Sequence, residues 1–288
     1  MKIKLKWLII FLFPATIVFG FIYAISVTML ITTSFTDLVA FSKPKFVGLE
    51  NYIYIFTGDK QLLKALSNTV IWMILQATIH IFIGVLAALI LSRNKFYSKF
   101  VKTVYMLPNI VSSAAIGMLF VMLLNPSYGF VNKALEVIGF QNLPNWFSDS
   151  GTAFFAVTVT WLPFAAVVTI LVMAEMTSID SSILEATTID GATEFQKNIY
   201  IILPLMKNII GTTTVLGVTS MLQKLDILMM TTKGGPGDDT LNLPIHLYNT
   251  AFVANRFARA NSIGVIMIIL GLFAVFLINK LYKIGENQ

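Results

Sequence analysis

Six long apolar stretches alternate with polar segments along the chain. A bilayer core of about 30 Å is crossed by about 20 residues of α-helix, because each residue adds about 1.5 Å. Backbone groups in lipid must hydrogen-bond within their own segment, so these stretches are expected to be helices. They cover approximately residues 7–31, 66–91, 101–124, 152–174, 209–230 and 262–280. The pattern predicts an all-α integral membrane protein with six transmembrane helices.

Basic residues in the short polar segments indicate the orientation of these helices. The segment before the first stretch and the one after the second contain basic residues and no acid, so both are expected in the cytoplasm. They are Lys2, Lys4 and Lys6, and Arg93, Lys95, Lys99 and Lys102. With six spans, the carboxyl terminus returns to the same side. The first stretch is too long for a cleaved signal peptide and lacks a small-residue cleavage site, so it is interpreted as a retained span.

The three segments expected outside the cell are each too short to form a separate domain. They cover residues 32–65, 125–151 and 231–261. The whole chain, 1–288, is therefore interpreted as one transmembrane domain. Residues 1–65 form its first span and outward loop, and residues 66–283 form its core.

Composition supports the membrane interpretation. The chain is 57% hydrophobic and 12% charged, against roughly a quarter charged residues in soluble domains. Its net charge of +6 lies mainly at the ends of apolar runs, where anionic lipid explains it better than nucleic acid. The chain contains no cysteine, which excludes disulfides, thiolate nucleophiles and cysteine-based metal sites.

The inward segment at about 175–207 differs from an ordinary cytoplasmic loop because it is rich in acids. Residues 183–189 are compatible with a helix that begins after Ser181-Ser182, Asp190-Gly191 breaks it, and a second run, 194–202, stops at Pro204. The first run offers a modest apolar face together with the charge of Glu185, which suits a groove on another protein. The alternative is an ordinary amphipathic connection between two spans.

The same segment resembles the EAA loop of binding-protein-dependent ABC importer permeases. The matching residues are Glu185-Ala186-Thr187-Thr188-Ile189-Asp190-Gly191-Ala192, followed by Ile202-Leu203-Pro204, with Thr187 in place of the second alanine. The resemblance implies the type I importer permease fold and a coupling loop that sits in a cleft of a cytoplasmic ATPase. It assigns contact with that ATPase to Glu185, Ala186, Asp190, Gly191, Ala192, Leu203 and Pro204. Glu185 would pair with a basic residue there, and Gly191 would provide the bend.

Other strings resemble the sugar branch of this family, the maltose, glycerol-phosphate and multiple-sugar type. They are Val47-Gly48-Leu49-Glu50-Asn51-Tyr52, Asn68-Thr69, and Gly234-Gly235-Pro236 with Thr240. The last string favours the Gly-Gly-Pro member of a heterodimeric permease. The implied partners are a second permease subunit, a dimeric ABC ATPase that binds ATP and Mg, an extracytoplasmic substrate-binding protein and the lipid bilayer. The substrate expected first is an oligosaccharide, with monosaccharide derivatives or glycerol phosphate next.

The sequence indicates that the chain itself is not an enzyme. No Gly-x-x-x-x-Gly-Lys-Ser/Thr motif occurs, and Asp238 and Asp239 follow the glycine cluster where they would repel phosphate. His80 and His246 lack metal-ligand spacing, so neither a cofactor nor a metal is expected. A secondary transporter or channel that works alone is the main alternative, but it would need internal repeats or mid-membrane carboxylates. A membrane enzyme is a further alternative, but the sequence shows no nucleophile, metal cluster or acid–base pair that could carry catalysis.

Polar residues in the fifth stretch are the candidates for a substrate pathway. Ser220, Gln223 and Lys224 would share one face of a regular helix, with Thr219 and Asp226 on a neighbouring face. Lys224 could equally snorkel to the membrane surface or pair with the second permease. In the fourth stretch, Trp161 beside Pro163 is a further candidate, with a packed tryptophan at a kink as the alternative. His80 is interpreted as a polar packing residue of the helix bundle. Asn109, Ser112 and Ser113 are interpreted as groups that hydrogen-bond between helices.

Overall fold

The computed structural model describes residues 5–285 apart from residues 41, 93–95 and 97, and it describes side chains from residue 11 onward. Four basic residues that indicated orientation, Lys2, Lys4, Arg93 and Lys95, lie outside this range, as does the side chain of Lys6.

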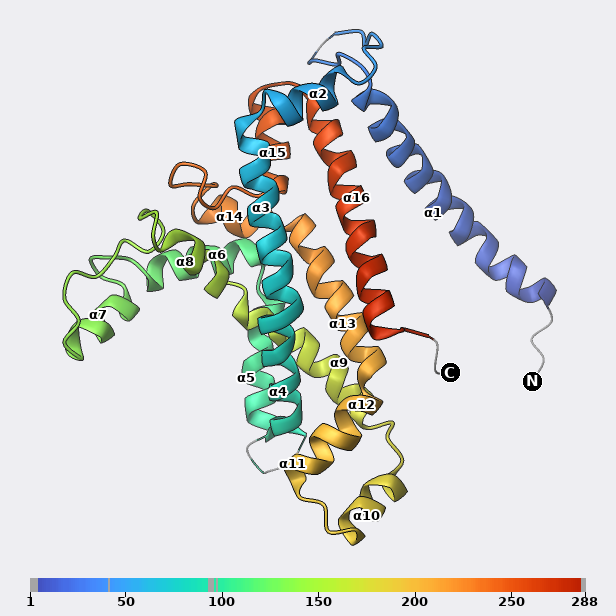
Figure 1. Cartoon of the computed structure of the whole chain (residues 1–288), viewed down its shortest axis with the longest axis vertical. Helices are drawn as coiled ribbons and strands as arrows, with labels where there is room; N and C mark the ends of the chain where they lie inside the picture. Colours follow the sequence, from blue (N-terminus) through green and yellow to red (C-terminus); the bar gives the residue numbers. More distant parts are fainter. Residues whose placement is uncertain (1–4, 41, 93–95, 97, 286–288) are drawn as a thin grey trace. The chain divides into compact units, whose positions relative to one another are not determined.

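Regular secondary structure in this described range is helical (Figure 1), and the nearest approach to a sheet is an isolated antiparallel bridge between Thr36 and Phe46. The prediction of an all-α chain is confirmed. The α-helices are α1 (Leu5–Ser34), α2 (Glu50–Thr57), α3 (Lys60–Leu75), α4 (Ile81–Leu91), α5 (Ser98–Ile110), α6 (Ser113–Leu123), α7 (Phe130–Val137), α8 (Ala153–Val159), α9 (Ala166–Met176), α10 (Ser181–Ile189), α11 (Glu194–Lys197), α12 (Leu203–Leu205), α13 (Lys207–Ser220), α14 (Asp226–Met230), α15 (Leu243–Tyr248) and α16 (Phe257–Tyr282). Short 3-10 or π turns are η1 (Gln76–His80), η2 (Leu162–Ala165), η3 (Asn198–Ile202), η4 (Met221–Gln223) and η5 (Asn249–Val253).

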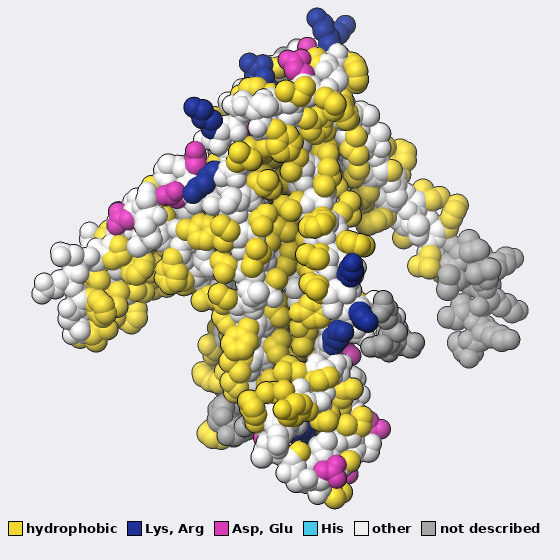
Figure 2. Space-filling view, in the orientation of Figure 1, with side chains coloured by type: hydrophobic (Ala, Val, Ile, Leu, Met, Phe, Trp, Pro, Cys, Tyr) yellow, Lys and Arg dark blue, Asp and Glu magenta, His cyan; other side chains and the backbone are white. Residues whose placement is uncertain are grey.

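Several of these helices are long and apolar enough to cross a membrane. Four continuous ones qualify within the described residues, namely Phe11–Ser34, Lys60–Leu91, Ala153–Met176 and Phe257–Tyr282. Two bent pairs qualify when each pair is taken together, Ser98–Ile110 with Ser113–Leu123 and Glu194–Leu205 with Lys207–Gln223. The described residues therefore contain four to six candidate spans. Figure 2 shows hydrophobic side chains spread widely over the face in view, interspersed with polar side chains and backbone.

The chain forms two compact units. One contains Met1–Leu62 and His246–Ile269, and the other contains Leu63–Ile245 and Leu270–Gln288. In the first unit, the Asn51 amide donates hydrogen bonds to the backbone oxygens of Ser34 (2.8 Å) and Thr36 (2.7 Å) at the end of α1. The hydroxyls of Tyr52 and Ser34 lie 2.7 Å apart. The string at residues 47–52 thus holds α2 against the end of the first long helix.

The core of the second unit joins α4, α9 and the end of the acidic segment. Six buried side chains form it: Ile81, Ala88, Val168, Val172, Ile202 and Met206. Gly84 lets α4 approach α9 closely, since a Cβ at this position would lie 2.5 Å from the Cβ of Val168. The Thr169 hydroxyl donates to the Gly84 carbonyl (2.9 Å) at the same contact. The two helices are locked together by close packing and a buried hydrogen bond.

The Gly-Gly-Pro loop is fixed by the Asn68-Thr69 pair of α3. The Asn68 amide donates to the backbone oxygens of Asp238 (3.3 Å), Asp239 (3.0 Å) and Leu241 (2.8 Å). The Thr69 hydroxyl accepts a hydrogen bond from the Leu243 backbone N–H (3.0 Å). Two strings about 170 residues apart in sequence are therefore parts of one hydrogen-bonded junction.

The third predicted stretch is not a single straight helix. Helices α5 and α6 meet at an angle of 104°. Between them Ser112 is extended (ψ 143°), and its hydroxyl accepts a hydrogen bond from the Ala115 backbone N–H (3.3 Å). This side-chain cap starts a new helix instead of continuing the old one, which is the physical reason for the break.

The fifth predicted stretch also differs, because regular helix ends before Lys224. Helix α13 stops at Ser220, η4 follows, and Lys224 has a non-helical ψ of 80°. The Asn242 amide donates a hydrogen bond to the Lys224 carbonyl (2.7 Å). This side-chain bond takes the place of the backbone N–H that would bond to the carbonyl in a continuous helix. Ser220, Gln223 and Lys224 therefore do not share the face of one continuous helix, and that prediction was wrong.

Within the acidic segment the predicted helix–bend–helix order is confirmed, with a shifted boundary. Helix α10 ends at Ile189, and Gly191 has a positive φ of 75°. Thr193 and Gln196 form a capping box at the start of α11. Helical structure continues past Pro204 to Leu205, because a proline in the first turn of α12 needs no backbone N–H partner.

Candidate functional site

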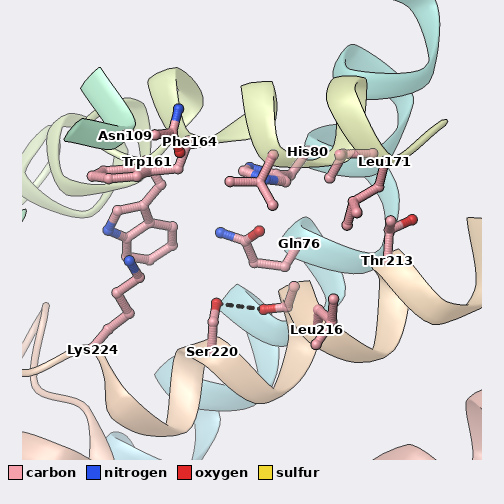
Figure 3. A pocket seen from close by; sticks show the side chains of 13 residues that line it. Gln76, His80, Asn109, Trp161, Phe164, Leu171, Thr213, Leu216, Ser220 and Lys224 are labelled. Atoms are coloured by element: carbon pink, nitrogen blue, oxygen red, sulfur yellow. Dashed lines mark hydrogen bonds between the residues drawn. The ribbon is translucent and has the colours of Figure 1, made fainter. Parts of the chain in front are cut away.

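A cavity of about 200 Å³ lies between the helices of the second unit. Its walls come from η1 (Gln76 and His80), from α5, from the η2–α9 segment and from α13 up to Lys224. Figure 3 shows Gln76, His80, Trp161 and Lys224 directed toward the same space from different elements. The second, third, fourth and fifth apolar stretches therefore contribute polar groups to one cavity.

Three of the predicted pathway residues line this cavity and three do not. Ser220, Lys224 and Trp161 are part of its wall, whereas Thr219, Gln223 and Asp226 are not. The Thr219 hydroxyl donates back to the Val215 carbonyl (2.7 Å) of its own helix. The break after Gln223 explains the separation, since it turns Lys224 inward while the Gln223 side chain is exposed.

Trp161 lies at the end of a buried aromatic stack. Its ring meets the edge of Trp72 with centroids 4.8 Å apart, and Trp72 stacks on Phe154 at 4.6 Å. The Trp72 N–H donates to the Thr158 hydroxyl (3.0 Å). The stack fixes the orientation of Trp161, and the Trp161 indole N–H has no hydrogen-bond partner among the described residues.

Two further cavity groups were not predicted as site residues. Gln76 and His80 are buried, and Gln76 Oε1 and His80 Nδ1 have no hydrogen-bond partner within the part of the chain that the structure describes. Buried polar atoms are nearly always paired, so three unpaired atoms around one cavity are unusual. Asn109 also lines the cavity, and its amide donates to the Pro163 carbonyl (3.5 Å), as helix packing predicts.

The charge distribution in the cavity is one-sided. Among the described residues that line it, Lys224 is the only Lys or Arg, and there is no carboxylate. The Lys224 Nζ lies 4.6 Å from the centroid of the Phe164 ring, a cation–π contact. Asp226 lies two residues further on, but its Oδ1 accepts a hydrogen bond from the Ile227 backbone N–H (2.9 Å). It is not within 4.0 Å of Lys224 in any ion pair of the described chain.

The second candidate site is the exposed surface of α10. Glu185, Ala186, Asp190 and Gly191 are exposed, and Ala192 is half-buried. Leu203 is half-buried and Pro204 is exposed on the next helical segment. On the opposite side, Leu184 packs against the core cluster that contains Val168. One helix therefore presents a free carboxylate outward and a leucine inward.

The start of α10 is capped by Asp180. Its carboxylate accepts a hydrogen bond from the Ser182 backbone N–H (2.9 Å), and this bond lowers the pKa of the Asp180 carboxyl below its usual value. The lowered pKa means that the cap is ionised at neutral pH. It is lost only when the pH falls through the depressed pKa of the folded state.

The Gly-Gly-Pro loop and His246 lie outside both candidate sites. Gly234 and Gly237 have positive φ values of 94° and 55°, and Pro236 follows a cis peptide bond from Gly235. The Thr240 hydroxyl donates to the Gly235 carbonyl (2.7 Å) and closes the loop. His246 lies in α15, where its Nε2 is 2.8 Å from Asp59 Oδ2, a carboxylate oxygen. The described residues contain no group of three or more potential metal ligands.

Comparison with known proteins finds the same kind of protein over nearly the whole chain. The permease YurN of Bacillus subtilis (strain 168), described as a probable ABC transporter permease, is 28% identical over 284 residues and 97% of each chain. The lactose transport system permease protein LacF of Rhizobium radiobacter is 30% identical over 253 residues, which are 85% of this chain and 83% of LacF.

A solved structure has the same fold. It is a bacterial ABC transporter involved in the import of the acidic polysaccharide alginate, with a TM-score of 0.82 and 22% identity. The match covers 98% of this chain and 97% of that one. The family described as binding-protein-dependent transport system inner membrane component matches residues 80–285. The chain is thus a membrane-spanning member of the binding-protein-dependent transport system inner membrane component family.

Proposed function

We propose that this chain is one of two permease subunits of an ATP-driven importer that carries a sugar or oligosaccharide across the cell membrane. Its single transmembrane domain has six spans, with both termini and the α10 segment in the cytoplasm. A second permease completes the channel, a dimeric ATPase binds ATP and Mg, and an extracytoplasmic protein delivers the substrate. The carbohydrate assignment is supported by relatives that are named for lactose and alginate import.

The observation that carries the proposal is the two-sided arrangement of α10. Glu185 is exposed and available to a basic groove on the ATPase. Leu184, its neighbour, packs on the cluster that contains Val168. Val168 also lines the cavity. Movement of α10 by the ATPase is transmitted through this packed core to the cavity wall, since close-packed interiors pass on strain.

The cavity provides the substrate pathway within this subunit. Its volume of about 200 Å³ is below the roughly 300–1,000 Å³ of drug-sized ligand sites. One subunit therefore accommodates part of a saccharide, and the second permease supplies the rest of the channel. Ser220 and Thr213 offer hydroxyls, and Trp161 offers both an aromatic ring and an N–H donor. Thr219, Gln223 and Asp226 are proposed to line the channel outside this cavity.

The test is ATP hydrolysis by the complete importer in lipid, measured against a sugar panel for wild type and Glu185→Ala. We expect one sugar with its binding protein to stimulate hydrolysis, and Glu185→Ala to abolish the stimulation while membrane levels stay normal. Glu175→Ala is the matched control, because Glu175 is an exposed acid at the end of α9 outside the proposed contact. Its stimulation should equal wild type. Solute movement by this chain alone, indifferent to ATP and to Glu185, would instead establish a secondary transporter or channel.

A further inference from the structure

We propose that the cavity binds an acidic sugar unit, and that Lys224 pairs with the carboxylate or sulfonate of the transported saccharide. This inference rests on the proposed function and adds the chemical class of the substrate. It is drawn from the charge and the hydrogen-bonding state of the cavity, which differ from what a pathway for neutral sugars requires.

Lys224 places a positive charge in the cavity wall, just beyond the end of regular helix. A charged side chain at membrane depth is costly, and such residues normally pair with an opposite charge or with backbone carbonyls. Among the described residues no carboxylate lies within 4.0 Å of the Lys224 ammonium; the Asp226 carboxylate, whose Oδ1 accepts from the Ile227 backbone N–H, acts on Lys224 only from farther away. The Lys224 Nζ lies over the face of the Phe164 ring. An aromatic face attracts a cation but leaves the ammonium N–H groups without acceptors. An anion that enters the cavity supplies a close negative charge and the missing acceptors.

Three polar atoms in the cavity wall have no hydrogen-bond partner among the described residues. The Trp161 N–H can only donate, Gln76 Oε1 can only accept, and His80 Nδ1 does either according to its tautomer. All three residues are more than nine-tenths buried. Figure 3 shows the Lys224 side chain extending toward Trp161, with Gln76 and His80 across the cavity. A sugar ring with one charged substituent matches this set, because its hydroxyls both donate and accept while its anion accepts from Lys224 and Trp161.

The cavity wall also differs from one that offers carboxylate acceptors to sugar hydroxyls. An ionised Asp or Glu side chain can accept several hydrogen bonds from such hydroxyls. The described lining of this cavity contains none. A lone cation without acids favours an anionic ligand and disfavours a cationic one. A solved transporter of the same fold is involved in the import of an acidic polysaccharide, and another relative is named for lactose, a neutral sugar. These similarities fit either class of substrate, so the choice between an acidic and a neutral sugar rests on the residues of the cavity.

The experiment measures uptake by cells that contain the whole importer. Sugars are offered as matched pairs, each a uronate-containing oligosaccharide with its neutral counterpart, such as digalacturonate with galactobiose. The variants are Lys224→Gln, Lys224→Arg and the control Lys133→Gln, which removes an exposed lysine of α7 that pairs only with Glu136 on the surface. Membrane level is quantified for every variant.

We expect wild type to take up the acidic member of a pair in preference to the neutral one. Lys224→Gln should lower that uptake at least about tenfold, because a charged hydrogen bond is lost. Lys224→Arg should retain most of the uptake and Lys133→Gln all of it. A purely structural role for Lys224 would lower the membrane level or reduce uptake of both members alike.

Two results overturn the inference while leaving the proposed function intact. One is uptake of a neutral sugar in preference to its acidic partner, and the other is undiminished uptake of the acidic sugar by Lys224→Gln. If no sugar of either class is taken up by the complete importer, the proposed function fails and this inference fails with it.

Discussion

At the scale of single residues, Asn68 shows how one amide holds a whole loop. Its Nδ2 donates to three backbone oxygens between Asp238 and Leu241, and the residue is buried. A single side chain therefore ties this irregular segment to α3, in addition to the segment's own backbone hydrogen bonds such as that from the Leu241 N–H to the Asp238 carbonyl (3.1 Å). The dependence of the Gly-Gly-Pro loop on α3 follows directly, because buried carbonyls without donors are costly.

We predict that Asn68→Ala loosens the Gly-Gly-Pro loop by about 1–3 kcal/mol, the cost of leaving buried polar groups unsatisfied. The measurement is limited trypsin digestion of the protein in lipid, followed at Lys233, which is exposed at the start of the loop. Cleavage at Lys233 should accelerate in the variant. Asn145→Ala, a change at an exposed asparagine outside the loop, is the control and should match wild type. Equal cleavage of Asn68→Ala and wild type would show that the loop is held by other contacts.

The cavity residues show what sequence alone can and cannot locate. Lys224 and Trp161 stand out because a charge or a tryptophan beside proline is unusual in an apolar stretch. Gln76 and His80 lie one helical turn apart in the second stretch, and in sequence they look the same as packing groups. Only the arrangement of four helices shows that these side chains face a cavity and lack partners. Polar residues within spans are therefore identifiable as a class, but their neighbours are not.

At the scale of secondary-structure elements, length and hydropathy predicted where helices lie but not where they break. The second and fourth stretches form continuous helical spans, and the all-α prediction holds. The breaks at Ser112 and Lys224 depend on a serine cap and on an amide from Asn242, 18 residues away. Such side-chain hydrogen bonds leave no periodic pattern in the sequence. The third and fifth stretches were therefore predicted as continuous helices, which they are not.

Gly191 is the clearest case of a break that the sequence did predict. Its φ of 75° is strained for any residue with a Cβ, yet a Cβ built there meets no atom within 4 Å. Gly191→Val should therefore cost about 1–2 kcal/mol of local backbone strain without a clash. We predict normal membrane insertion with ATP hydrolysis that no longer drives sugar uptake, because the altered bend misplaces Glu185.

The measurement for Gly191→Val is sugar imported per ATP hydrolysed by the reconstituted importer. Gly139→Val is the matched control, since Gly139 also has a positive φ (95°) and open space around it but follows α7. That variant has the same kind of strain at another place and should remain coupled. Normal coupling in Gly191→Val would mean that the α10 bend has no part in energy transfer.

At the scale of the whole molecule, composition identified a membrane protein, because so apolar a chain must contact lipid. Helix α1 illustrates the point, since Phe11, Phe13 and Phe19 are among its many exposed apolar side chains. The order of the motifs that match importer permeases then identified the family. What composition cannot provide is the connection between distant segments. The contact that joins Leu184 of α10 to the α4–α9 core follows from the fold alone.

The last prediction concerns that connection. If α10 moves the cavity wall through Leu184 and the cluster around Val168, Leu184→Ala should lower the amount of sugar imported per ATP while ATP hydrolysis continues. Leu184 is only partly buried, so the variant should lose less than the roughly 2–5 kcal/mol of a fully buried Leu→Ala change and remain folded. Leu63→Ala, at a leucine that is 59% exposed on α3, removes the same atoms without touching the core and serves as control.

Two outcomes distinguish a packed connection from a purely electrostatic one. If Leu184→Ala uncouples the importer while Glu185 still recruits the ATPase, binding and transmission are separate functions of adjacent residues on one helix. If Leu184→Ala transports as efficiently as wild type, the ATPase moves the spans by another route. The Glu185 contact would then account for docking alone, because a helix that can slip against its core transmits little displacement.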